Sequence, residues 1–157
     1  MFSLVGLALS AVVHLATLVN ADIERLVPYI WVLHVGIFVV CVPMLILIMK
    51  SMRINAAATF FRDVLPKSLL FLLLAVFAYG FINFALCSEA FENGNPMMQG
   101  NGYVIRIRGQ SDKEISYNEY MELQIKQMRA FSGLWLIFYF ASFAYFSSER
   151  VSARSSP

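Results

Sequence analysis

Two histidines, His14 and His34, are the residues whose positions suggest chemistry most clearly, because each interrupts a long apolar run. His14 precedes Asn20 by six residues, and His34 follows Pro28 by six residues. If Asn20 and Pro28 mark the outer ends of two neighbouring membrane helices, the helical rise places both imidazoles about 9 Å below the same membrane boundary. An ionisable side chain inside a membrane is by default a candidate functional residue.

Imidazoles on facing helices can act as the two axial ligands of a b-type haem. A quinone headgroup, hydrogen-bonded by one histidine and by a tyrosine or an asparagine, is a second form of the same hypothesis. We expect four more cofactor-binding candidates at this depth from the later helices: Tyr79, Asn83, Trp135 and Tyr139. Either cofactor would make the protein an electron carrier at the outer side of the membrane. The simpler interpretation is a pair of interior histidines that are hydrogen-bonded for packing alone.

Apolar runs separated by polar connections must position these side chains. Apolar residues make up 59% of the 157 residues and charged residues only 14%, whereas soluble domains usually have about 25% charged residues. Each run has about the ~20 residues that cross a ~30 Å hydrocarbon layer as a helix. The sequence therefore predicts an all-α membrane protein, a four-transmembrane-helix bundle in a single membrane domain over residues 1–157. We expect the spans at about 2–20, 27–49, 68–87 and 130–147.

The distribution of basic residues predicts the orientation of the spans. The connection between the second and third spans has one acidic residue, Asp63. Its four basic residues lie close to helix ends: Lys50, Arg53, Arg62 and Lys67. Such connections stay in the cytoplasm, so we expect both termini there and residues 88–128 outside.

No Lys or Arg precedes the first apolar run. A signal peptide would have such a charge, so we expect this run to be a retained helix.

Residues 88–128 predict a small ordered extracytoplasmic cap, a β-hairpin beside a helix. Tyr103–Arg108 alternates between apolar and polar residues, and Lys113–Ile115 can form the second strand. Ser116 and Glu119 form an S-x-x-E capping box, which predicts a helix that begins at Tyr117 and runs unbroken into the fourth span. Turn-forming residues precede the hairpin in the segments Asn93-Gly94-Asn95-Pro96 and Gly100-Asn101-Gly102.

The cap and the fourth run also resemble a known pattern. The residues concerned are Pro96, Gly100, Gly102-Tyr103, Gly109, Ile115-Ser116, Glu119-Tyr120, Arg129, Phe131-Ser132-Gly133 and Trp135. They are similar to residues in uncharacterised small bacterial four-helix inner-membrane proteins, over about a third of the chain. The resemblance implies a bacterial inner (plasma) membrane and a four-helix topology, and it implies no activity. Where that family tends to have histidines, this chain has Leu134 and Arg108, so a ligand role of those histidines does not carry over.

Motifs of common enzymes are missing from the sequence. There is no H-E-x-x-H motif, glycine-rich phosphate loop or nucleophile elbow, so we name no catalytic residue and no metal ligand. The net charge of +2, without a basic run, gives no footprint for nucleic acid.

We therefore expect a small accessory or interaction protein that acts through its outward cap and its helix faces. Its partner would be another membrane protein or a second copy of itself, within the lipid bilayer. The candidate partner-contact residues lie in the first strand of the hairpin: Tyr103, Ile105, Arg106, Ile107 and Arg108. A redox protein that binds haem or quinone through His14 and His34 is the alternative.

Overall fold

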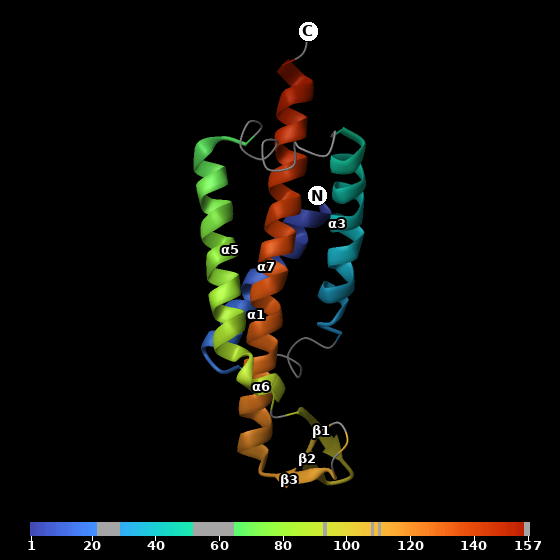
Figure 1. Cartoon of the computed structure of the whole chain (residues 1–157), viewed down its shortest axis with the longest axis vertical. Coiled ribbons are helices and arrows are strands. Elements are labelled where there is room, and N and C mark those ends of the chain that lie inside the picture. Colours follow the sequence, from blue (N-terminus) through green and yellow to red (C-terminus); the bar gives the residue numbers. More distant parts are fainter. Residues whose placement is uncertain (22–28, 52–64, 93, 108, 110, 156–157) are drawn as a thin grey trace.

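The computed structural model describes residues 1–21, 29–51, 65–92, 94–107, 109 and 111–155. Its long helices are α1 (Phe2–Leu18), α3 (Val32–Ser51), α5 (Lys67–Cys87) and α7 (Tyr117–Ser155). α7 lies at the centre, with α5 on one side and α3 on the other, and α1 packs against both α7 and α3 (Figure 1). The chain alternates in direction, so that α5 leads into a small cap and α7 returns from it (Figure 1).

Among the residues that the structure describes, three helical segments are long and apolar enough to cross a membrane: Val32–Lys50, Lys67–Cys87 and Tyr117–Ser148. α1 is equally apolar in character but shorter, with 17 residues. Large apolar side chains on the outer faces of these helices are exposed, among them Phe71 and Leu86 on α5. Burial from water would stabilise such surface by roughly 25 cal/mol per Å², so these faces suit a hydrocarbon environment.

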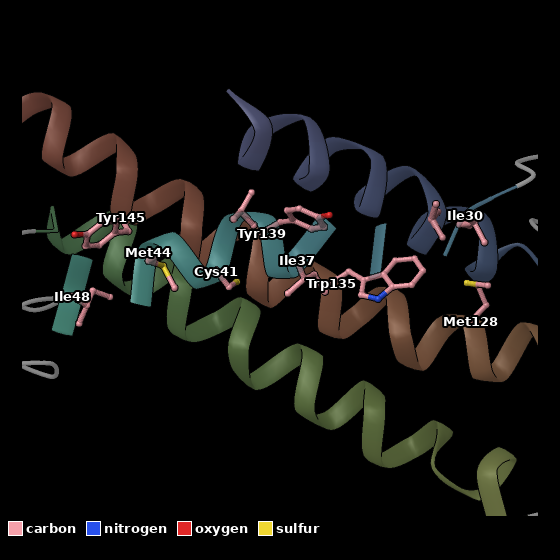
Figure 2. Close-up of a cluster of buried hydrophobic side chains, with 11 residues drawn as sticks. Ile30, Ile37, Cys41, Met44, Ile48, Met128, Trp135, Tyr139 and Tyr145 are labelled. Carbon is pink, nitrogen blue, oxygen red and sulfur yellow. The ribbon is translucent and has the colours of Figure 1, made fainter. Parts of the chain in front are cut away.

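The side of α7 that faces α3 is lined by large aromatic residues. Figure 2 shows Trp135, Tyr139 and Tyr145 from α7 in a row with residues of α3. The α3 members of this cluster include Ile37, Cys41, Met44 and Ile48. A second cluster joins Phe140 and Ala144 of α7 to Leu73 of α5. α7 thus has two packed faces, which explains why it is the best buried of the apolar helices.

Glycines let the ring of Tyr139 approach two helices at once. A Cβ placed on Gly6 of α1 would overlap the Tyr139 ring, and one on Gly36 of α3 would overlap its hydroxyl oxygen. That hydroxyl donates a hydrogen bond of 2.8 Å to the carbonyl oxygen of Leu33. Small residues at such crossings allow close backbone packing between membrane helices.

The cap is a three-stranded antiparallel sheet with the order β1-β2-β3, joined to α5 through the short helix α6 (Glu89–Glu92). Its strands are β1 (Asn95–Gln99), β2 (Gly102–Arg106) and β3 (Lys113–Ile115). The β2–β3 hairpin confirms the sequence prediction, with Tyr103 opposite Ile115. β1 was not predicted, because Asn95 and Pro96 were interpreted as part of a turn. A proline is tolerated there because β1 lies at the edge of the sheet, where only one side needs ladder donors.

The start of α7 is fixed by the predicted capping box. Glu119 Oε2 accepts hydrogen bonds of 2.8 Å from both the backbone N–H and the hydroxyl of Ser116. The Ser116 hydroxyl oxygen accepts one of 3.3 Å from the Glu119 N–H. From Tyr117 the helix continues without a break through the apolar segment, as predicted.

The connection predicted to lie in the cytoplasm, between the second and third spans, falls mostly in 52–64, outside the residues that the structure describes. Residues 22–28, between α1 and α3, also lie outside them.

Candidate functional site

The imidazole of His14 is a buried polar group with a hydrogen-bond partner at each ring nitrogen, and the residue is 3% exposed. Its Nδ1 lies 2.9 Å from the Ser132 hydroxyl of α7, and its Nε2 lies 2.5 Å from the Tyr79 hydroxyl of α5. The Ser132 hydroxyl donates to the carbonyl oxygen of Arg129 at 3.1 Å, so Ser132 accepts from His14. A consistent assignment therefore has the proton on Nδ1, with Nε2 accepting from Tyr79. Both nitrogens of His14 are used within the protein.

Further hydrogen bonds extend this network to the cap end of the helices. The Thr17 hydroxyl donates to the His14 carbonyl oxygen at 2.6 Å, and Arg129 Nη2 donates to the Thr17 carbonyl oxygen at 2.6 Å. Asn83 Nδ2 donates to the Arg129 carbonyl oxygen at 2.9 Å. The network therefore ties α1, α5 and α7 together across their common interface.

His34 belongs to a different environment. Its Nδ1 lies 3.2 Å from Trp135 Nε1, and an indole N–H can only donate. Nδ1 is therefore the acceptor, and the proton of the neutral imidazole lies on Nε2. Four aromatic rings surround this half-buried imidazole at centroid distances of 5.8 to 6.4 Å, in edge-to-face arrangements: Trp31, Phe38, Phe131 and Trp135. Within the described residues, Nε2 has no hydrogen-bond partner.

The structure thus separates the cofactor candidates into two groups. Tyr79 contacts His14 directly, and Asn83 lies in the same network. Trp135 contacts His34, and Tyr139 bonds to the backbone near it. Axial haem ligation needs one free nitrogen on each imidazole, directed at a shared iron. His14 has no free nitrogen, so the described residues do not fit a bis-histidine haem.

The predicted partner-contact strand has a packed side and an exposed side. Tyr103 stacks against Tyr117 and Tyr120 of α7, at centroid distances of 5.3 and 4.7 Å. Ile105 is buried, whereas Tyr103 and Ile107 are half-buried and keep some accessible surface. Arg108 lies outside the described residues.

Arg106 is the exposed member of that strand. Its guanidinium donates two hydrogen bonds to the Asp112 carboxylate, at 3.1 and 2.8 Å. This interaction holds the pKa of the Asp112 carboxyl below its ordinary value. The rest of the cap's accessible surface includes Met98 of β1, 63% exposed, and Glu114 of β3.

Sequence reasoning missed an open hollow of about 600 Å³, lined by Asn20, just beyond the C-terminal end of α1, and by the cap-side part of α7. Lys126 and Arg129 are among its lining residues. The signal was present in the sequence, since these two cations are three residues apart on one helix face, just before the apolar run.

Comparison of the chain with protein-family models, with curated proteins and with solved structures gives no match.

Proposed function

We propose that this is a multi-pass protein of a bacterial inner (plasma) membrane, with α1, α3, α5 and residues 130–147 of α7 as a four-helix bundle. Both termini lie in the cytoplasm and the cap faces outward. The exposed apolar faces of α3 and α5 and the alternating helix directions support this placement. α1 is the shortest span, and its buried small and polar residues pack it against the bundle: Ser3, Gly6, Ser10, His14 and Thr17.

Within that membrane, we propose that the protein is a small accessory or interaction protein that presents its cap to a partner. One observation carries this proposal: α7 is a single helix of 39 residues that also supports the sheet. At the usual rise it measures about 58 Å, roughly twice the thickness of the hydrocarbon layer. The cap is therefore held at a fixed height above the membrane. A rigidly held surface binds a partner with a smaller entropic cost than a mobile one.

Site-specific photocrosslinking tests this function. A photoreactive amino acid replaces Met98 on β1, Glu114 on β3 or, as the lipid-facing control, Phe71 on α5. We expect the two cap positions to form the same adduct with a second protein in intact cells, and the control position to form none. Adducts only between copies of this chain, from all three positions, would contradict a hetero-partner.

A second candidate function is favoured by the hydrogen bonding of His34. Trp135 occupies Nδ1 and leaves the Nε2–H as a donor among aromatic rings. A quinone headgroup has a carbonyl acceptor for this N–H and a flat ring that can pack against Trp31 or Phe131. On this proposal the site binds a lipid-soluble quinone through His34 alone, and His14 serves packing.

Titration with a short-chain benzoquinone in detergent distinguishes the two functions. Saturable quenching of tryptophan fluorescence should be present in the wild type and in a His14→Leu variant, and absent from His34→Leu. Equal saturable quenching in the His34→Leu variant would remove the support for the quinone site and leave the partner proposal intact.

A further inference from the structure

The hollow at the outer end of α1 combines charges of both signs with apolar walls. Its lining includes Asn20 at the end of α1 and, on α7, Met121, Glu122, Ile125, Lys126 and Arg129. Its volume of about 600 Å³ is within the range of small-molecule sites. None of these residues is used by the two proposed functions above.

The cations of the hollow are held in place by neighbouring acceptors. Arg129 Nη2 is anchored by the Thr17 carbonyl oxygen at 2.6 Å, while Arg129 Nε is buried without a partner in the described part of the chain. Lys126 Nζ pairs with Glu122 Oε1 at 2.7 Å, and both side chains are largely exposed. The hollow therefore has a guanidinium anchored by α1 and an exposed ion pair between Lys126 and Glu122.

The position of the hollow relative to the proposed membrane decides which ligand can reach it. Arg129 immediately precedes the proposed span of residues 130–147, at the level of the lipid headgroups. Beside it, α1 ends at Leu18, followed by Val19, and both side chains are exposed. A molecule in the hollow would thus have a polar part above and an apolar surface below.

We infer that the hollow binds the headgroup of a zwitterionic aminophospholipid from the outer leaflet. Lys126 and Arg129 contact the phosphate through charge-assisted hydrogen bonds. The Glu122 carboxylate, which also lines the hollow, faces the ammonium group. The same carboxylate repels an isolated anion, so free phosphate fits the hollow less well. This inference rests on the proposed membrane placement and not on the identity of a protein partner.

Lipid titration of the purified protein in detergent tests the site. The probes are phosphatidylethanolamine, phosphatidylglycerol, diacylglycerol of the same chains, and inorganic phosphate, and the readouts are the Tm and the lipid retained in native mass spectrometry. Phosphatidylethanolamine should raise the Tm more than each of the other probes. The exposed Lys126→Gln variant should bind it about tenfold more weakly, the size expected for one hydrogen bond to a charged group. Lys113→Gln, an exposed lysine outside the hollow, is the matched control and should bind as the wild type does.

Several outcomes would overturn the inference. They are equal affinity in the Lys126→Gln variant and the wild type, equal weakening by Lys113→Gln, or equal stabilisation by phosphatidylglycerol, diacylglycerol or inorganic phosphate. Carbonate extraction of cell membranes separates this failure from that of the placement. A protein that stays in the membrane pellet but shows no preference for phosphatidylethanolamine loses only the lipid site.

Discussion

A single side chain, His14, joins three helices, because its two nitrogens bond to α5 and α7 while the residue itself belongs to α1. In water such bonds would compete with solvent. Among membrane helices the competition is weaker, but the alternative pairings of the unfolded chain still reduce the gain. The network therefore fixes helix rotation and register more than it adds to total stability.

Replacing Tyr79 by Phe should reveal this role. The variant keeps the ring but leaves His14 Nε2 without its donor, and we expect the free energy of unfolding to fall by about 0.6–2 kcal/mol. Unfolding in mixed detergent and dodecyl sulfate measures the change. Tyr29→Phe, at an exposed tyrosine outside the interior network, is the matched control. An equal and small effect of both substitutions would contradict the network.

The sequence predicted that Tyr79 and Trp135 lie near the two histidines, but not which histidine each of them contacts. Spacing along a helix gives the height of a residue along the bundle, and both His14 and His34 lie toward the cap end of their helices. The partners depend on how each helix is rotated about its axis. That rotation depends on long-range contacts, such as the His14 hydrogen bonds and the Tyr139 contact with Gly6, which no local pattern in the sequence encodes.

At the scale of elements, the N-terminus of α7 depends on one hydroxyl. A Ser116→Ala substitution removes the hydroxyl acceptor of the Glu119 N–H, and the loss of an N-cap typically costs about 1 kcal/mol. We expect faster amide exchange over the first turn of α7, measured by hydrogen–deuterium exchange, with little change in the apolar segment. Ser111→Ala, at an exposed serine of the connection between β2 and β3, should leave exchange as it is. Unchanged exchange in Ser116→Ala would show that packing alone holds this turn.

The β2–β3 hairpin should lose protection in acid. The hydrogen bond from Arg106 depresses the pKa of Asp112 below its ordinary value of 3.8. A carboxyl whose pKa is lower in the folded than in the unfolded state stabilises the folded state at pH values above the unfolded pKa. This contribution disappears as the pH falls through the folded pKa. Amide protection factors of the hairpin should therefore be constant from pH 7 to 5 and fall below about pH 4. The Asp112→Asn variant should show a smaller fall, and an identical fall would assign it to other groups.

The start of α7 was predicted well because a specific hydrogen-bonding motif marks it in the sequence. The capping box predicted the start of α7, because a side chain and a backbone N–H three residues apart satisfy each other locally. β1 could not be predicted in the same way, since its five residues pair with β2 through backbone groups that every sequence offers. Only the contact with the rest of the cap selects a strand over the turn that Asn95 and Pro96 indicated.

For the whole molecule, the proposed orientation makes a simple prediction about labelling. Cys41 and Cys87 are buried, so a new surface cysteine can be labelled above a low background. A membrane-impermeant maleimide should label Met98→Cys in cells with a permeable outer membrane. Lys50→Cys lies near the C-terminal end of α3, which is the end away from the cap. This cysteine should be labelled only after the inner membrane is opened. Labelling in the reverse order would invert the proposed topology.

The apolar runs predicted helices, but they did not reveal that α7 is central. Residues that face lipid and residues that face another helix are both apolar, so hydropathy does not separate them. The stripe of Ser132, Trp135, Tyr139 and Ser142 was a partial signal, because these residues are buried and spaced on one face. The second packed face of α7, toward α5, had no comparable mark.

The central position of α7 has a consequence for biosynthesis, because the helix that contacts all the others is translated last. At roughly 5–20 residues per second, α1 precedes the completion of α7 by roughly 7–27 seconds. On the proposed membrane placement, α1, α3 and α5 leave the translocon during this interval without the surface against which they pack. Their polar side chains, His14 and Asn83 among them, are exposed to lipid or to insertion chaperones until α7 emerges. A ribosome that stalls before residue 130 would therefore release an orphaned intermediate, a natural substrate for membrane quality-control proteases.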